Sequence, residues 1–195
     1  APGCGINSAS STRPCGTTGM SGTSMSSPAV TGVAALVREY YRKGFYPDGT
    51  AVPAHAFEPS GALVKATLIN AGQDMTGVPG YPNFQEGWGR LQADRALSFP
   101  ESDHGLWVQD VPGAQGLSTG DTREYALTLQ SGGVPLRVTL AWMDYPGLPA
   151  GGGAWLVNDL DLEVVDQNGT VYRGNNIVDG ASAGEPVAAA APDPS

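Results

Sequence analysis

The chain has 195 residues and a formal net charge of −9, and 41% of its residues are hydrophobic while 15% are charged. This hydrophobic share argues against intrinsic disorder, which requires low hydrophobicity together with high net charge. Ten Lys and Arg against nineteen Asp and Glu argue against a surface that binds nucleic-acid phosphates or an anionic membrane. The composition predicts an acidic, folded chain of one large or two small domains and leaves its chemistry open.

Helical periodicity appears in the first half of the chain. A helix over residues 24–43 is predicted, with Gly44 as its left-handed stop and Pro28 in its first turn, where a missing N–H costs little. A second helix is expected after the N-cap Ser60 and before Gly72, and a short one over 92–98. The apolar positions behind the two longer helices are Val30, Val33, Ala34, Val37 and Tyr41, and then Leu63, Ala66, Thr67 and Leu68.

After Pro100 the hydrophobic period changes to two, which is typical of strands with one buried and one wet face. Asn168-Gly169 is a hairpin turn signal. No helical pattern interrupts the strands, so the second half is predicted to be an antiparallel sandwich or barrel, with a domain boundary near residue 100. The predicted strands lie near 105–110, 122–130, 134–143, 156–166 and 170–173.

The two cysteines, Cys4 and Cys15, lie in a segment rich in Gly, Ser, Thr and Pro that lets the chain double back. A disulfide between them is predicted; it would imply an oxidising, extracytoplasmic compartment and stabilise the fold by ~2–3 kcal/mol. The alternative is two unpaired cysteines in a cytosolic loop. Neither His55 nor His104 stands at a metal-ligand spacing from them, so a zinc site is not expected.

One short segment carries the chemistry of the sequence: Gly22-Thr23-Ser24-Met25-Ser26-Ser27-Pro28. Gly22 permits a tight approach to the predicted helix, and Ser24 opens that helix with its hydroxyl exposed. Free N–H groups and the positive dipole end of a helix suit a developing oxyanion. The alternative for a serine at such a position is an ordinary N-cap. The segment differs from the Gly-x-Ser-x-Gly elbow, because Ser26 stands at the second glycine position.

This segment resembles the nucleophile segment of the subtilisin family of serine proteases, the subtilases, in which Gly-Thr-Ser-Met-Ala-x-Pro begins a buried central helix. Ser26 replaces the family's Ala. The stretch from Pro59 to Asn70 resembles the next family helix, and Gly87-Trp88-Gly89-Arg90-Leu91 resembles the strand entry that closes the catalytic domain. The resemblance implies that residues 1–100 are the C-terminal portion of an α/β, parallel-sheet catalytic domain.

The resemblance also implies roles for the residues of the segment. Ser24 is the expected nucleophile, and its backbone N–H is one oxyanion donor. Thr23 adds its hydroxyl and Gly22 supports the close approach. Met25 is the expected oxidation-sensitive position, with a plain packing role as its alternative.

Subtilases order their triad as Asp, His and Ser along the chain. Both His55 and His104 follow Ser24, so each is expected to be an ordinary surface histidine. The catalytic Asp and His and the oxyanion Asn are therefore expected upstream of Ala1. The chain alone is predicted to be inactive.

Residues 101–195 resemble the jelly-roll-like β-sandwich that follows the catalytic domain in some secreted alkaline subtilases. The resemblance rests on Val138–Trp142, Leu156–Leu162, Asn168–Thr170 and Tyr172–Asn175. About five strands are predicted where such sandwiches have seven or eight, so this all-β antiparallel domain is expected to be incomplete.

Several carboxylates gather in that second half. Asp159, Asp161 and Glu163 fall on one face of a period-two strand, with Asn158 and Asp144 as helpers. Hard cations such as calcium favour such oxygen ligands, so a structural calcium site is one interpretation. A solvated acidic strand face is the other.

Together these features predict a secreted serine endopeptidase that acts on protein or peptide substrates through Ser24. Its expected partner is the upstream part of its own catalytic domain; neither nucleic acid nor membrane is expected, and catalysis requires no cofactor. The alternative is a non-catalytic binding or structural module derived from a degenerate subtilase.

Overall fold

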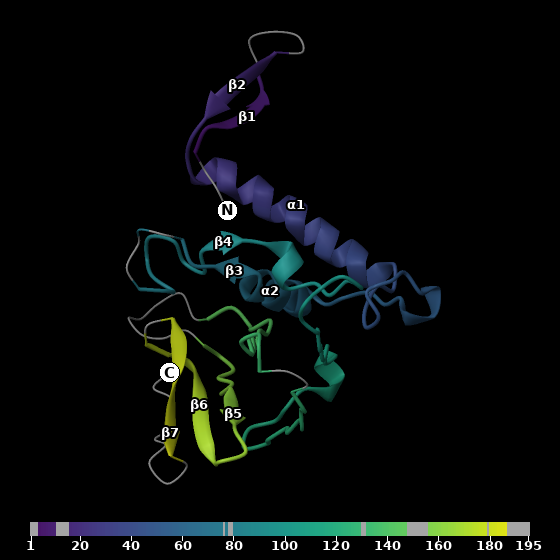
Figure 1. Cartoon of the computed structure of the whole chain (residues 1–195), viewed down its shortest axis with the longest axis vertical. Helices are drawn as coiled ribbons and strands as arrows, with labels where there is room; N and C mark the ends of the chain where they lie inside the picture. The colour runs from purple at the N-terminus through teal and green to yellow at the C-terminus, as the bar shows by residue number, and fades with distance from the viewer. Residues whose placement is uncertain are drawn as a thin grey trace. The chain divides into compact units, whose positions relative to one another are not determined.

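The computed structural model describes residues 4–10, 16–75, 77, 80–129, 132–147, 156–178 and 180–186. The chain divides into two compact units (Figure 1). The first comprises Ala1–Gly72 and Arg90–Ala141, and the second comprises Gln73–Gly89 and Trp142–Ser195. The domains 1–100 and 101–195 stay predictions.

The first unit begins with an antiparallel hairpin of β1 (Ile6–Ala9) and β2 (Thr17–Met20), which leads directly into the long helix α1 (Thr23–Arg42) (Figure 1). The helix was expected over 24–43, so the prediction is confirmed to within one residue at each end. Gly44 stops it with a φ of +70°. A side chain there would collide with the carbonyl oxygen of Val52, so glycine is required both by the backbone conformation and by the close approach.

The core of this unit lies between α1 and the shorter helix α2 (Gly61–Asn70). Tyr41 is fully buried, and its ring lies edge-on to that of Tyr40 at 5.3 Å. Burying one large apolar side chain contributes about 1.5–3 kcal/mol, so this cluster is the main source of stability in the unit. Its buried members are Val37, Tyr40, Tyr41, Leu63 and Leu97, and Val33, Phe57 and Leu68 are among those packed against them.

Burial also changes the chemistry of the two tyrosines. Desolvation raises the pKa of Tyr40 to about 12, although its hydroxyl donates to the carbonyl of Ser98 at 2.7 Å. Desolvation likewise raises the pKa of Tyr41, whose hydroxyl lies 3.2 Å from the Thr67 hydroxyl. Both phenols are therefore neutral at ordinary pH.

Two helix details differ from the sequence-based expectation. Pro28 is the sixth residue of α1, in the second turn rather than the first, because the helix already begins at Thr23. The N-cap at Ser60 is confirmed, since its hydroxyl accepts from the Leu63 N–H at 3.0 Å, and α2 ends at Asn70, before Gly72 as expected. The expected helix over 92–98 is a single 3₁₀ turn, Ala93–Arg95. Further 3₁₀ turns are Pro53–His55 and Gly113–Gln115. Two short strands, β3 (Gly72–Gln73) and β4 (Arg90–Leu91), lie at the points in the sequence where one unit ends and the other begins.

The strands predicted between residues 105 and 143 are wrong within the described part of that range, where the backbone forms no strand. Leu136, Val138 and Leu140 were expected on a buried face but are 47%, 42% and 40% exposed. A strand needs a partner's hydrogen bonds and a covering layer as well as an alternating pattern. From Gly105 to Asp110, exposed and half-buried residues still alternate along the chain, although the backbone there forms no strand.

The second unit contains a three-stranded antiparallel sheet in the order β5 (Glu163–Val165), β6 (Thr170–Val178) and β7 (Ala181–Pro186) (Figure 1). The predicted turn at Asn168-Gly169 is confirmed, with Gly169 at a φ of +80° between β5 and β6. The predicted strands were longer at 156–166 and shorter at 170–173. One three-stranded sheet does not confirm a β-sandwich.

A single carboxylate organises this turn. Asp166 accepts from the backbone N–H groups of Thr170 at 2.9 Å and Asn168 at 2.8 Å. The hydrogen bond from Thr170 is the largest cause that holds the pKa of Asp166 below its usual value. An Asx turn of this kind fixes the register of a hairpin, which is why the local sequence was sufficient to predict it.

Candidate active site

Ser24 is the second residue of α1, directly after the position at which the chain turns into the helix. That turn is made by Gly22, whose φ of 148° and ψ of 169° fall in a region essentially restricted to glycine. The Ser24 side chain is exposed, and none of the described residues forms a hydrogen bond with its hydroxyl. Its oxygen is thus free to react with a molecule that approaches the helix end.

The start of α1 is electrostatically suited to an anion. The Met25 N–H bonds back to the carbonyl of Gly22 at 3.0 Å, whereas the N–H groups of Thr23 and Ser24 find no acceptor in the described part of the chain. The first turn contains no acidic residue. Unpaired N–H groups and the positive end of the helix dipole together favour a negative oxygen beside Ser24.

Thr23 and Met25 flank Ser24 in the first turn of α1. Thr23 is exposed, and Met25 is half-buried. The Met25 sulfur lies 3.8 Å from where a side-chain carbon at Gly22 would stand. Met25 therefore lies beside the backbone turn that precedes Ser24, and the predicted roles of Thr23, Ser24 and Met25 stay predictions.

The two histidines pair with carboxylates and not with Ser24. His55 is exposed and its Nδ1 lies 3.1 Å from Asp48, as a surface histidine should be. His104 differs from the expectation: its side chain is only 16% exposed, its Nδ1 lies 3.1 Å from Asp103, and its buried Nε2 has no hydrogen-bond partner among the residues that the structure describes. The order of Ser24 and the histidines along the chain contains no signal for this packing.

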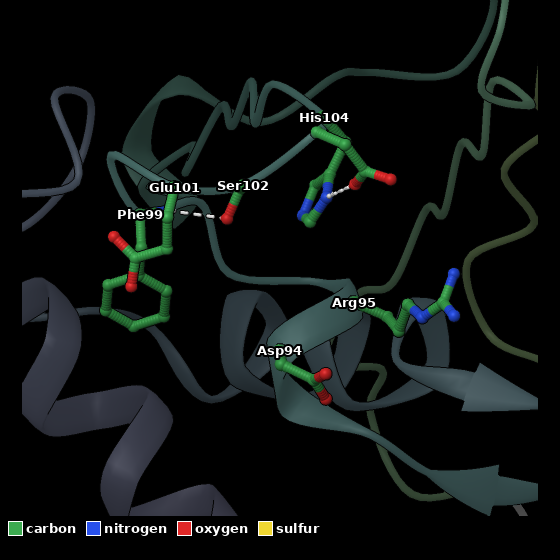
Figure 2. A pocket seen from close by; sticks show the side chains of 7 residues that line it. Asp94, Arg95, Phe99, Glu101, Ser102 and His104 are labelled. Carbon is green, nitrogen blue, oxygen red and sulfur yellow. Dashed lines mark hydrogen bonds and ion pairs between the residues drawn. The ribbon is translucent and has the colours of Figure 1, made fainter.

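A cavity of about 380 Å³ adjoins His104 (Figure 2). The hydrogen bond from His104 is the main cause of a lowered pKa at Asp103. Within the loop, the Ser102 hydroxyl accepts from the Phe99 N–H at 3.0 Å. These contacts describe a structured loop. The lining residues are Asp94, Arg95, Phe99, Glu101, Ser102, Asp103 and His104.

The predicted disulfide involves one residue that the structure describes. Cys4 is exposed and forms no disulfide with a described residue. Its sulfur accepts from the Ser21 hydroxyl at 3.7 Å, and that hydroxyl in turn accepts from the Gly5 N–H at 2.9 Å. Cys15 lies outside the described residues, so the disulfide stays a prediction.

The predicted calcium ligands differ in the contacts that their side chains make. The Asp144 carboxylate accepts from the N–H groups of Tyr145, Val157 and Asn158 and from the Asn158 side chain, at 2.7–3.1 Å. Desolvation alone would raise the pKa of Asp144, but these hydrogen bonds together lower it. Asp159 and Asp161 are exposed. Glu163 pairs with Arg173 at 2.5 Å.

No group of three or more His, Cys, Asp or Glu in the described ranges is arranged to hold a metal ion. From Asp159 to Val165, exposed and half-buried residues alternate, which confirms the alternation predicted for this stretch. The three acids of the stretch therefore share a solvated side.

These observations define an exposed serine at the start of a long helix, and comparison with known proteins specifies the class of protein further. Residues 1–89 match the Subtilase family, and this part of the chain belongs to that family. No solved structure gives a match.

The most similar curated relatives include three proteins of Dictyostelium discoideum. The serine protease/ABC transporter B family protein tagA is 32% identical and tagD 31% identical, over 80% and 75% of this chain. The protein tagB of the same description is 29% identical over 80% of the chain. The chain spans only 9–10% of the length of these relatives. Within the described residues, no helix combines the length and apolar character needed for a membrane span.

Proposed function

We propose that Ser24 is the nucleophile of a serine endopeptidase of the subtilase family. The observation that carries the proposal is the position of Ser24: it follows Gly22 at the start of α1, and within the described residues neither its hydroxyl nor the N–H groups of Thr23 and Ser24 form a hydrogen bond. The membership of residues 1–89 in the subtilase family supports a protease function at the level of the family.

In the proposed reaction, the Ser24 Oγ attacks a peptide carbonyl while a histidine base takes its proton. The resulting oxyanion accepts hydrogen bonds from the Ser24 N–H and from an Asn side chain, with Thr23 in support. The C–N bond then breaks, the amine leaves with the proton from the histidine, and water hydrolyses the acyl-enzyme. The two histidines of this chain pair with Asp48 and Asp103 instead of Ser24, which supports the proposal that the base, its Asp and the Asn are supplied by upstream sequence.

The test is active-site labelling of the full-length parent protein with a fluorophosphonate, followed by mapping of the adduct. We expect the label on Ser24, and its complete loss in Ser24→Ala. Ser27→Ala is the matched control, since Ser27 is also exposed on the first turns of α1, and it should label like the wild type. A label on another serine would contradict the proposal. Absence of any label would favour the alternative, a non-catalytic module from a degenerate subtilase.

The isolated 195-residue chain is expected to show no peptide hydrolysis, because it would lack the general base. Removing members of a catalytic triad typically lowers kcat by a factor of about 10⁴–10⁶. The measurement is turnover of a fluorogenic peptide by the chain alone and by its Ser24→Ala variant. Turnover that Ser24→Ala abolishes would show that the base lies within these residues.

The remaining proposals concern the environment of the enzyme. We propose secretion, a Cys4–Cys15 disulfide, protein or peptide substrates, and association with the upstream part of the catalytic domain; no cofactor, nucleic acid or membrane enters the reaction. A structural calcium ion at Asp159 and Asp161, assisted by Asn158 and Asp144, is the proposal that thermal unfolding tests directly. Calcium should raise the melting temperature of the wild type but not of Asp159→Asn/Asp161→Asn, and an equal response of both would contradict the site.

A further inference from the structure

Helix α2 lacks charged residues of its own at both ends. Over its ten residues, its first turn contains no acid and its last turn no base. A helix is ordinarily stabilised by a carboxylate near its positive N-terminus and a cation near its negative C-terminus. In this chain both charges come from the sequence that follows residue 100.

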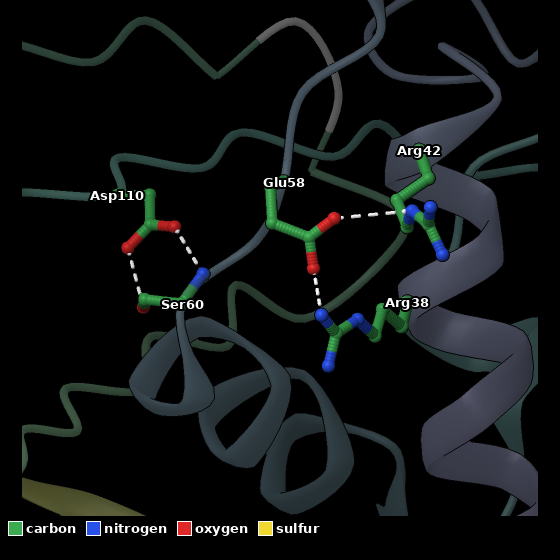
Figure 3. A network of polar contacts seen from close by, with 5 residues as sticks. All are labelled: Arg38, Arg42, Glu58, Ser60 and Asp110. Carbon is green, nitrogen blue, oxygen red and sulfur yellow. Dashed lines mark hydrogen bonds and ion pairs between the residues drawn. The ribbon is translucent and has the colours of Figure 1, made fainter.

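The carboxylate at the N-terminus of α2 belongs to Asp110 (Figure 3). Its two oxygens accept from the Ser60 N–H at 2.7 Å and from the Ser60 hydroxyl at 2.6 Å. The Ser60 hydroxyl also accepts from the Leu63 N–H at 3.0 Å. Asp110 thus fixes the N-cap itself, and through it the first turn of the helix.

The cation at the C-terminus of α2 belongs to Arg137. Its Nη1 donates to the carbonyl of Gly72 at 2.8 Å and to that of Asn70 at 3.3 Å. The Thr139 hydroxyl lies 3.5 Å from the Asn70 side chain. Asn70 is the last residue of α2, where carbonyls lack intrahelical partners, and Gly72 begins β3 two residues later.

The segment that carries Asp110 is held firmly against the helices. Leu106 and Val108 pack on the core cluster, and the Val108 N–H donates to the Tyr46 hydroxyl at 3.3 Å. Beside Ser60, Glu58 pairs with both Arg38 and Arg42 of α1, the latter at 3.0 Å (Figure 3). The N-terminus of α2 is therefore tied to α1 on one side and to Asp110 on the other.

We propose that Asp110 and Arg137 form a charge clamp on α2, by which the sequence after residue 100 completes the fold of the subtilase segment. The clamp is a conformational device: release of the 105–139 segment leaves both ends of α2 without their charges and opens the core that α2 shares with α1. The inference does not depend on catalysis by Ser24.

The test uses Asp110→Asn and Arg137→Met in the 195-residue chain. Hydrogen bonds to a charged group contribute enough that each variant should lower the folding equilibrium constant about 10- to 100-fold in urea unfolding. Native-state hydrogen exchange should quicken first at the N-terminal turn of α2 in Asp110→Asn and at its C-terminal turn in Arg137→Met. Glu124→Gln is the matched control for Asp110→Asn, and Arg123→Met is the matched control for Arg137→Met. Arg123 also donates to a carbonyl, but to that of Gln115 and not to one at the end of α2.

A rescue variant separates the charge from general destabilisation. Gly61→Glu gives α2 its own carboxylate, and Gly61→Ala controls for helix propensity. In the Asp110→Asn background, Gly61→Glu should raise the folding constant about 2- to 5-fold above Gly61→Ala. With Asp110 present, like-charge repulsion should remove this gain. An equal effect of Gly61→Glu in both backgrounds, or clamp variants as stable as their controls, would overturn the proposal.

Discussion

The pair Tyr41 and Thr67 in the core provides a prediction whose direction can be worked out from hydrogen counting. The Thr67 hydroxyl donates its single proton to the carbonyl of Leu63 at 2.9 Å. Tyr41 must therefore be the donor in the 3.2 Å contact between the two hydroxyls. Both residues are buried, with Tyr41 at 0% and Thr67 at 6% exposure.

The two single substitutions should consequently differ in cost. Thr67→Val leaves the Tyr41 hydroxyl as a buried donor without an acceptor, which costs about 1–3 kcal/mol. Tyr41→Phe leaves the Thr67 hydroxyl satisfied by Leu63, so it should cost only the net value of one hydrogen bond, about 0.5–1.5 kcal/mol. The double variant removes the unpaired donor and should be no less stable than Thr67→Val.

The assay is urea unfolding of the four proteins of the cycle, analysed for the free energy of unfolding and the coupling energy. The expected order of destabilisation is Thr67→Val above Tyr41→Phe, with a favourable coupling energy of about 1 kcal/mol. If Tyr41→Phe proved the more destabilising single change, the direction assigned to this hydrogen bond would be wrong.

Two further predictions concern Gly22 and Tyr40. Gly22→Ala places a side chain on a residue whose φ is 148° and should destabilise the start of α1 by about 1–3 kcal/mol. Fluorophosphonate labelling of Ser24 in the full-length parent should therefore slow. An unchanged labelling rate would show that the turn is not needed to present Ser24. Because burial raises the pKa of Tyr40 to about 12, above its unfolded value, its contribution to stability is complete below the unfolded pKa and is lost as pH rises toward 12. Urea unfolding from about pH 9 to about pH 12 should show a weaker loss of stability in Tyr40→Phe than in the wild type, and identical profiles would refute the assignment.

Local patterns were sufficient where the interactions are local. The period of Val37 and Tyr41 located α1, Ser60 bonds a residue three positions on, and the Asn168-Gly169 turn is fixed by Asp166 within the same few residues. Ser24 was likewise located by a contiguous motif. Such features depend on contacts that the neighbouring sequence contains in full.

The tertiary structure decided what depends on distant partners. Ser60 and Asp110 are 50 residues apart, and Gly72 and Arg137 are 65 apart; the only local signal for either contact was the lack of charge at the ends of α2. The alternation at Leu136 and Val138 predicted a strand with a buried face, but no described segment pairs with it. The sequence alone thus determined the two long helices and the candidate serine at the start of α1, while burial, strand pairing and the capping of α2 required the folded chain, because each is a property of two segments brought together.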